Sequence, residues 1–137
     1  MSFVIREFSS VSEFIKSIDD ELTELRRTLS ELLRRLEELR IKAEQERKLK
    51  ELLLKIKGTG TSPETNTVEL KNIKIILNPS PEQEVASLQQ AIENINNRIV
   101  QLQGIRKDLE VLSGTELEVK LEVIYVNGLP RVVLLRM

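Results

Sequence analysis

The chain has 137 residues, and its 21 Lys and Arg against 22 Asp and Glu give a formal net charge of −1. It contains no cysteine, histidine or tryptophan, which excludes disulfides, zinc sites built from cysteine or histidine, and any Ser-His-Asp triad. No apolar run approaches the roughly 20 residues of a membrane-spanning helix, so we expect a soluble, cytoplasmic protein without membrane contact.

The first part of the chain predicts a short strand followed by one long helix. Residues 1–9 have the pattern of a strand or an N-terminal arm. Ser10, with Glu13 three residues later, forms a capping box that marks a helix start. We expect this helix over residues 10–57, because glycine at position 58 tolerates the left-handed backbone found just past helix ends.

The middle of the chain predicts a linker and a strand. Residues 58–66 have the glycine, serine and proline content of a linker. Their first residues faintly resemble a phosphate-binding loop, but they follow a helix and lack the Gly-Lys-Ser/Thr ending, so a flexible connection is the better interpretation. Residues 67–78 alternate like a strand, and the alternation changes phase at Lys71 and Asn72, which predicts a bulge or a kink.

A second helix is expected over residues 80–113. Ser80 is the expected cap, Pro81 occupies the first helical position, and Gln83 completes a second capping box. Gly114 follows as the residue at which this helix stops.

Residues 115–136 predict a β-hairpin. Asn127 and Gly128 form the preferred two-residue turn, in which both residues need positive φ. Pro130 favours an edge position for the last strand, since proline cannot donate a backbone hydrogen bond to a neighbour. The turn sets the expected cross-strand pairs, which are Val123 with Val132 and Leu121 with Leu134. All elements together predict one α+β domain of residues 1–137 in the order β-α-β-α-β-β, with two long coiled-coil-forming helices and a small three- to four-stranded sheet.

Apolar residues recur alternately three and four positions apart along the first helix, which is the spacing of a coiled coil. A helix over residues 10–57 would be about 70 Å long. The predicted strands span only about 20–40 Å and the second helix is shorter, so we expect another chain to cover part of the stripe in a homodimer or tetramer. The predicted interface residues are Ile18, Leu22, Leu25, Leu29, Leu32, Leu36 and Leu39.

Two further features bear on how the helices associate. Arg35 and Arg40 would repel across a parallel two-stranded dimer, which favours a bundle with two helices from each chain. Both helices also break their apolar spacing at matched distances before their stop glycines, at Leu49 and at Ile105. This match suggests that the two helices of one chain run parallel, and a coincidence of two helix ends is the alternative.

Basic residues gather near the end of the first helix and could contact nucleic-acid phosphates. Aromatic side chains for base stacking are scarce, so single-stranded nucleic-acid binding is an alternative function, and an ordinary solvated helix end is the other interpretation. The candidate nucleic-acid-binding residues are Arg47, Lys48, Lys50, Lys55 and Lys57.

Carboxylates and amides are the remaining polar groups of note. The acidic residues of the first helix lie on its charged face, where a catalytic pair would lack a desolvated pocket, so we expect no enzyme activity, metal or cofactor. The second helix carries uncharged amides that are either simply exposed or form a partner surface. These amides are Gln89, Gln90, Asn94, Asn96, Asn97, Gln101 and Gln103.

The architecture resembles two known groups of proteins. Long coiled-coil helices joined to a small β part resemble prefoldin-type chaperones, although prefoldin subunits place their hairpins between the helices and the hairpin of residues 115–136 follows both. The plan is also similar to small archaeal single-stranded-DNA-binding proteins that join a four-stranded sheet to a leucine zipper. No functional residues carry over from either. The ion-pair-rich, cysteine-free composition resembles that of thermophile proteins. We therefore expect a structural, assembly or adaptor protein, with nucleic-acid binding and chaperone activity as alternatives.

Overall fold

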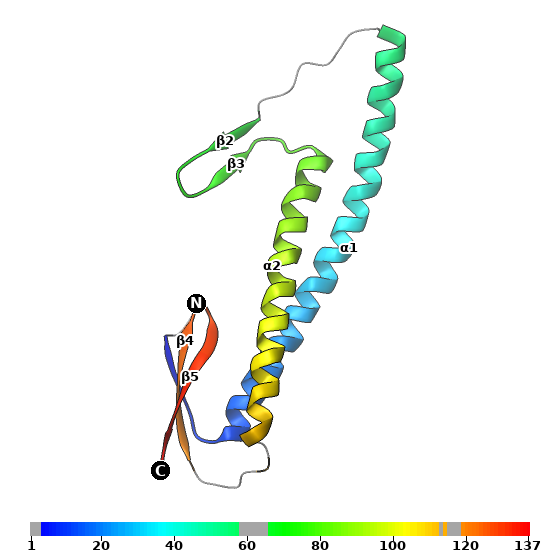
Figure 1. The fold of residues 1–137 in the computed structure, drawn as a ribbon. Coiled ribbons are helices and arrows are strands. Elements are labelled where there is room, and N and C mark those ends of the chain that lie inside the picture. The colour runs from blue at the N-terminus through cyan, green and yellow to red at the C-terminus, as the bar shows by residue number, and fades with distance from the viewer. Residues whose placement is uncertain (1–3, 58–65, 113, 115–118) are drawn as a thin grey trace. The chain divides into compact units, whose positions relative to one another are not determined.

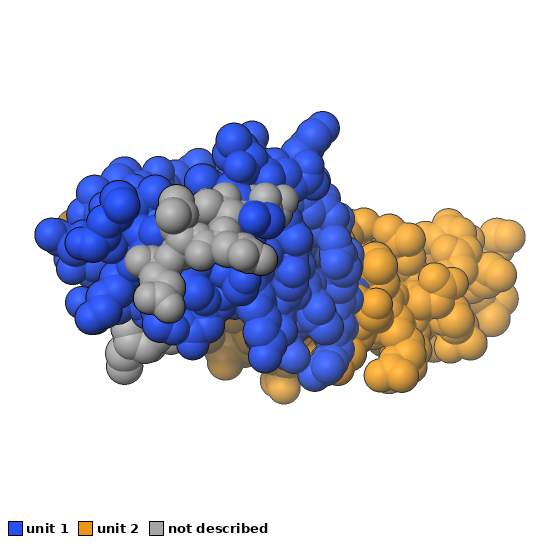
Figure 2. All heavy atoms as spheres, turned by 90° about the horizontal axis from the view of Figure 1, so that it is seen from below, with its two compact units in different colours: residues 1–29, 94–137 blue, residues 30–93 orange. Residues whose placement is uncertain are grey.

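The computed structural model describes residues 4–57, 66–112, 114 and 119–137. The elements in chain order are β1 (Ile5–Phe8), α1 (Val11–Lys57), β2 (Thr67–Glu69), β3 (Lys74–Ile76), α2 (Pro81–Asp108), a 3-10 turn η1 (Leu109–Leu112), β4 (Lys120–Val126) and β5 (Leu129–Arg136) (Figure 1). The fold class is α+β, as predicted. The chain divides into two compact units (Figure 2), of which unit 1 comprises Met1–Leu29 with Asn94–Met137 and unit 2 comprises Ser30–Glu93.

Both helices begin at the predicted caps. At the start of α1 the Ser10 hydroxyl accepts the N–H of Glu13 at 3.1 Å, and the Glu13 carboxylate accepts the N–H of Ser9 at 2.9 Å rather than that of Ser10. At the start of α2 the box is reciprocal, because Ser80 Oγ accepts the N–H of Gln83 at 3.2 Å and Gln83 Oε1 accepts the N–H of Ser80 at 3.0 Å. Side-chain acceptors thus satisfy N–H groups that have no partner within the helix.

The two helix ends differ in what can be described. The predicted stop of α1 at position 58 lies outside the described residues. At the end of α2 the last residues tighten into η1, and Gly114 follows with a φ of 81°. Glycine readily adopts this left-handed backbone, as expected just past a helix end, although the α-helix itself ends at Asp108, earlier than predicted.

Unit 1 contains an antiparallel three-stranded sheet in the order β1-β4-β5. Asn127 and Gly128 have φ values of 54° and 77° in the turn between β4 and β5, as predicted, and β5 with its Pro130 lies at the sheet edge. The predicted register is wrong by one residue. The observed pairs are Val123 with Val133 and Leu121 with Leu135.

An irregularity near the turn explains the shifted register. Tyr125 pairs with Pro130, but the next pair is Ile124 with Val132, so Arg131 is an extra residue on β5. One extra residue is the mark of a β-bulge, which moves every later pair by one position. The turn residues alone do not reveal such a bulge.

The core of unit 1 forms where the sheet packs against both helices. Phe14, Leu102 and Val123 are fully buried, and the rings of Phe8 and Phe14 have their centroids 5.1 Å apart. Within each helix or strand, the residues that enter the core are spaced so that their side chains share one face of that element. The buried core residues are Phe8, Val11, Phe14, Ile18, Leu22, Ile99, Leu102, Leu121, Val123 and Leu129.

The two helices run antiparallel in unit 1, which corrects the parallel arrangement inferred from their matched spacing breaks. Asp19 pairs with Arg106 at 2.9 Å, whereas Glu21, further along α1, pairs with Arg98, which is earlier in α2, at 3.6 Å. Figure 1 shows the same opposed directions. The matched breaks are therefore a coincidence of two helix ends and not a sign of alignment.

Unit 2 holds a separate hairpin where one strand was predicted. β2 and β3 pair antiparallel, with Thr67 opposite Ile76, and Leu70 donates its N–H to the carbonyl of Ile73 at 2.9 Å across the connection. The phase change at Lys71 and Asn72 is thus a chain reversal and not a bulge. A strand that turns back also shifts its alternation, so the pattern alone did not separate the two cases.

A pair of amides anchors this hairpin to the start of α2. The Asn66 and Gln83 side chains exchange two hydrogen bonds of 2.7 Å, and Asn66 also donates to the carbonyl of Leu77 at 3.1 Å. The Gln83 side chain therefore serves both the helix cap and the hairpin.

Candidate functional site

The seven predicted interface residues of α1 lie on a face that the chain itself largely covers. Ile18 and Leu22 belong to the core of unit 1, where they are 2% and 4% exposed. Leu36 and Leu39 of unit 2 are also buried. The other three, Leu25, Leu29 and Leu32, are half-buried. Only the half-buried part of this stripe is available to a partner.

Most of the large exposed apolar residues of α1 lie further along the helix. α1 has 47 residues and α2 has 28, so α2 is too short to cover all of its antiparallel neighbour. Four large apolar residues near the end of α1 are 43–70% exposed, and we call them the distal stripe. They are Leu49, Leu52, Leu53 and Ile56.

The distal stripe points in another direction than the covered stripe before it. At about 100° per residue, its centre is rotated by roughly 120° from that of Leu32, Leu36 and Leu39. The break in spacing at Leu49 causes this rotation, because it moves the apolar residues to another face of the helix. A helix packed on the covered stripe would therefore leave the distal stripe in water.

The hairpin of unit 2 adds a second apolar surface. Its strands, their connection and the residue just after β3 carry five large apolar side chains that are 42–64% exposed. A two-stranded hairpin without cover on either face is at best marginally stable in water. The five residues are Val68, Leu70, Ile73, Ile75 and Leu77.

The predicted nucleic-acid-binding residues lie together on α1, but Arg47 is already paired. Its guanidinium contacts Glu44 at 2.6 Å and Glu51 at 2.8 Å. The hydrogen bond and the charge of Glu44 raise the pKa of Arg47, and the same contact lowers the pKa of Glu44. An arginine held by two carboxylates has less charge to offer a phosphate.

The lysines of this cluster remain candidates for contact with nucleic-acid phosphates. Lys48, Lys50 and Lys55 are exposed, and the side chain of Lys57 lies outside the described residues. Lys48 and Lys55 are seven positions apart and share a helix face. Leu52 of the distal stripe lies on this same face, whereas Leu49, Leu53 and Ile56 lie on another, so variants can change the two lysines and Leu49 with Leu53 separately.

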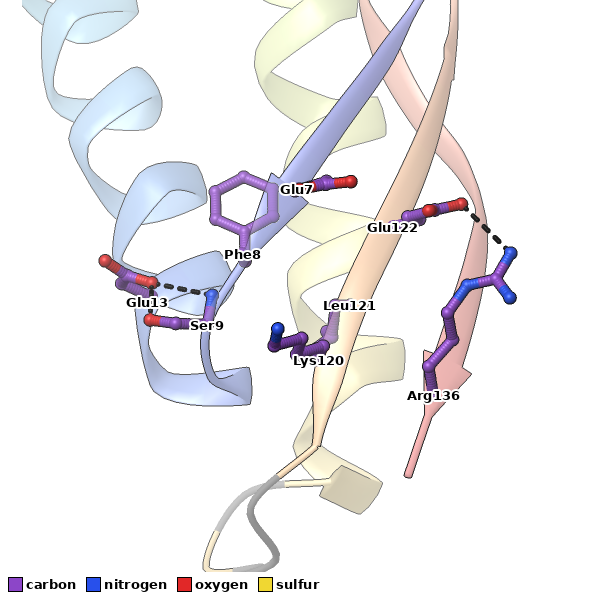
Figure 3. A pocket seen from close by; sticks show the side chains of 8 residues that line it. All are labelled: Glu7, Phe8, Ser9, Glu13, Lys120, Leu121, Glu122 and Arg136. Carbon is purple, nitrogen blue, oxygen red and sulfur yellow. Dashed lines mark hydrogen bonds and ion pairs between the residues drawn. The ribbon is translucent and has the colours of Figure 1, made fainter.

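A hollow of about 430 Å³ opens at the sheet of unit 1 beside the start of α1 (Figure 3). Glu7, Glu13 and Glu122 line it together with Lys120 and Arg136. Hydrogen bonds from Ser9 lower the pKa of Glu13, and Arg136 lies 3.4 Å from Glu122. A carboxyl group with a lowered pKa is ionised at neutral pH and cannot act as a general acid.

A second hollow is lined by residues that the sequence pattern does not place together. Asn94, Asn97 and Gln101, noted only as amides of the second helix, face the turn between β4 and β5 across it. Arg98 and Arg131 also line it and were not predicted as functional residues. Arg98 lies between the amide residues Asn97 and Gln101 in the sequence. No neighbouring residue indicates that the hairpin turn packs beside this face of the helix.

Other kinds of site have no support in the described part of the chain. Over these residues, no three acidic side chains gather closely enough to hold a metal ion, and neither helix has an apolar stretch long enough to cross a membrane. Comparison with known protein families, curated proteins and solved structures gives no match to this chain.

Proposed function

We propose that this protein is a non-enzymatic assembly or adaptor protein that associates with further copies of itself through unit 2. The observation that carries the proposal is the distal stripe, in which Leu49, Leu53 and Ile56 keep coiled-coil spacing but are 43–70% exposed. The surface that such a stripe packs against is another helix with the same spacing. A second copy of the chain provides that helix, and closed homo-oligomers are the commonest assemblies of soluble proteins.

Covering the distal stripe with a partner is energetically more favourable than leaving it exposed to water. Full burial of a leucine side chain stabilises by about 1.5–3 kcal/mol relative to its exposure to water. Because these side chains are about half exposed, each contributes roughly 1 kcal/mol when a partner covers it. Singly exposed leucines are ordinary, but a contiguous group on one helix face is typical of an interaction surface.

The hairpin of unit 2 supports the same interpretation. The exposed residues Val68, Ile73 and Ile75 belong to the same unit as the distal stripe. Either a homodimer or a tetramer would cover both surfaces. The half-buried Leu25, Leu29 and Leu32 would add to the interface in a bundle of four helices.

The test is the mass of the intact chain in solution, measured by light scattering after size-exclusion chromatography. The double variant Leu49→Glu with Leu53→Glu places two charges in the distal stripe and is expected to be a monomer. The double variant Lys48→Gln with Lys55→Gln changes the net charge by the same amount and is expected to keep the oligomer. A monomeric parent chain would refute the proposal.

A chaperone-like function is the second candidate, and one structural observation favours it. The hairpin β2–β3 lies between the two helices in sequence, which is the placement described above for prefoldin subunits. Exposed apolar side chains on this hairpin and in the distal stripe could hold an unfolded chain.

The two candidates differ in a client assay. A chaperone-like protein suppresses the aggregation of a chemically denatured client in proportion to its own concentration, and Ile73→Glu with Ile75→Glu should abolish that effect. An assembly protein forms its oligomer and leaves client aggregation unchanged.

A further inference from the structure

A hollow of about 380 Å³ lies in unit 1 between α2 and the turn that joins β4 to β5. Its polar lining consists of four carboxamides and two guanidinium groups, and none of its described lining residues is acidic. In this it differs from the hollow in Figure 3, which three glutamates line. The six polar residues are Asn94, Asn97, Arg98, Gln101, Asn127 and Arg131.

The helix holds one side of this hollow in a fixed geometry. Asn94, Asn97 and Gln101 are three and four positions apart, so they share one face of α2. Ile95, which also packs against the core, and Leu129 of β5 add two apolar residues to the lining. The helix fixes the spacing of the three Cα atoms, whereas the exposed amide side chains still have to be ordered when a ligand binds.

Arg98 is held in place under the hairpin turn. Its Nη2 donates to the carbonyl of Gly128 at 3.1 Å and lies 3.6 Å from a carboxylate oxygen of Glu21. A side chain at position 128 would occupy the place of this guanidinium. Gly128 therefore serves the turn, through its positive φ, and also the approach of Arg98.

Arg131 supplies the positive charge that is not shared with a carboxylate, since the guanidinium of Arg98 lies 3.6 Å from Glu21. It is the extra residue of the bulge in β5, and it is exposed. No hydrogen bond or ion pair joins its side chain to another described residue. The bulge thus presents an unpaired guanidinium at the same hollow that Arg98 lines.

We propose that this hollow binds a small organic oxyanion, a molecule with one phosphate or carboxylate group and a neutral part that carries hydrogen-bond donors and acceptors. Guanidinium groups match phosphate and carboxylate oxygens through paired N–H donors. Carboxamides both donate and accept, so they suit the neutral part. The volume lies at the lower end of the range for small-molecule sites. The site is in unit 1, and the proposal does not rest on self-association.

The test is an NMR titration of the intact chain, followed through its backbone and side-chain amide signals. The probes are uridine 5′-monophosphate, N-acetylglutamate, inorganic phosphate and uridine. We expect at least one of the two organic anions to saturate signals of Asn97, Gln101 and Asn127 below about 10 mM. Uridine, which lacks the oxyanion, should bind at least roughly tenfold more weakly than its monophosphate.

Matched variants identify the groups responsible. Arg131→Gln should weaken the bound anion by at least roughly tenfold, whereas Arg40→Gln, an exposed arginine of unit 2, should leave it unchanged. Gln101→Ala should weaken the organic anion without affecting inorganic phosphate. All three residues are exposed, so the fold should persist.

Three results would overturn the proposal. The first is saturation by none of the anions. The second is equal weakening by Arg131→Gln and Arg40→Gln, which would show a general charge effect. The third is equal affinity for inorganic phosphate and the organic anions, which would show that the amides contribute nothing.

Discussion

The Nε of Arg106 lies 2.9 Å from Oδ1 of Asp19 and joins α2 to α1 across 87 positions of sequence. Asp19 is near the start of α1 and Arg106 is near the end of α2, so the two residues meet because the helices run antiparallel. Both side chains are substantially exposed, at 31% and 51%. The pair therefore reports the alignment of the helices, and the question is whether it also determines that alignment.

We predict that this ion pair contributes little to stability. Exposed pairs are worth about 0.2–1 kcal/mol because water and salt screen them. A double-mutant cycle with Asp19→Asn and Arg106→Gln, measured by urea unfolding, should give a coupling free energy in that range. A coupling well above it would mean that the pair directs the helix alignment.

The buried apolar core should determine the alignment instead. Leu102 is completely buried between α2 and the rest of the core, and Leu102→Ala should lower the free energy of unfolding by about 2–5 kcal/mol. Val100, two positions away on the same helix, is 66% exposed, so Val100→Ala is the matched control and should change it by less than about 0.5 kcal/mol. Similar effects of both substitutions would contradict the assigned core.

Local features of the sequence were sufficient to predict most elements. The caps at Ser10 and Ser80 and the turn at Asn127 and Gly128 depend on residues within four positions of each other, and all were predicted correctly. The bulge at Arg131 was missed because it adds one residue without a distinctive residue type. Helix direction was missed because the pairing of α1 with α2 is a non-local property.

The candidate sites were predictable to a smaller extent. Periodicity identified Leu36 and Leu39 as a packed stripe, but it does not distinguish cover by the same chain from cover by a second chain. The lysine cluster was visible as composition, whereas the two carboxylates that hold Arg47 follow only from side-chain geometry. The hollow at Arg98 and Arg131 could not be predicted from the sequence, because its prediction requires knowing which face of α2 the hairpin turn contacts.

Glu13 predicts a pH dependence of stability at the start of α1. Hydrogen bonds from Ser9 lower its pKa below the ordinary value of 4.5. Because the folded-state pKa is the lower one, its contribution to stability is fully present above the unfolded-state value and is lost as the pH falls through the folded-state value. Unfolding measured between neutral pH and the acid range should show a smaller loss at low pH for Glu13→Gln than for the parent chain. Glu7→Gln is the control, because Glu7 makes no such contact with Ser9. Identical acid profiles for the parent and Glu13→Gln would refute this role.

The lysine cluster makes a separate prediction for nucleic-acid binding. Lys48, Lys50 and Lys55 could contact only a few phosphates, so any binding of a single-stranded oligonucleotide should be weak and should decrease steeply with salt. Each lost contact should reduce the slope of log affinity against log salt by about 0.7. Lys48→Gln with Lys55→Gln should therefore lower the slope by about 1.4 in fluorescence anisotropy. No binding by the parent chain at low salt would exclude this function for the cluster.

Two double variants distinguish between the two candidate self-association surfaces of α1, which are the earlier stripe and the distal stripe. Leu36 is buried within its own chain, so Leu29→Glu with Leu36→Glu should reduce helix content as well as mass, since burying an unpaired carboxylate destabilises the fold itself. Leu49→Glu with Leu53→Glu introduces charges where both side chains are already about half in water.

The second variant should therefore lose the oligomer but keep its helix content. Circular dichroism and light scattering on the same samples measure the two quantities together. If the Leu49 and Leu53 variant keeps its mass while the Leu29 and Leu36 variant dissociates without unfolding, the interface lies on the earlier stripe, as the heptad pattern first indicated. Burial of Leu25, Leu29 and Leu32 by a partner would then contribute more to self-association than burial of the distal stripe at the end of α1.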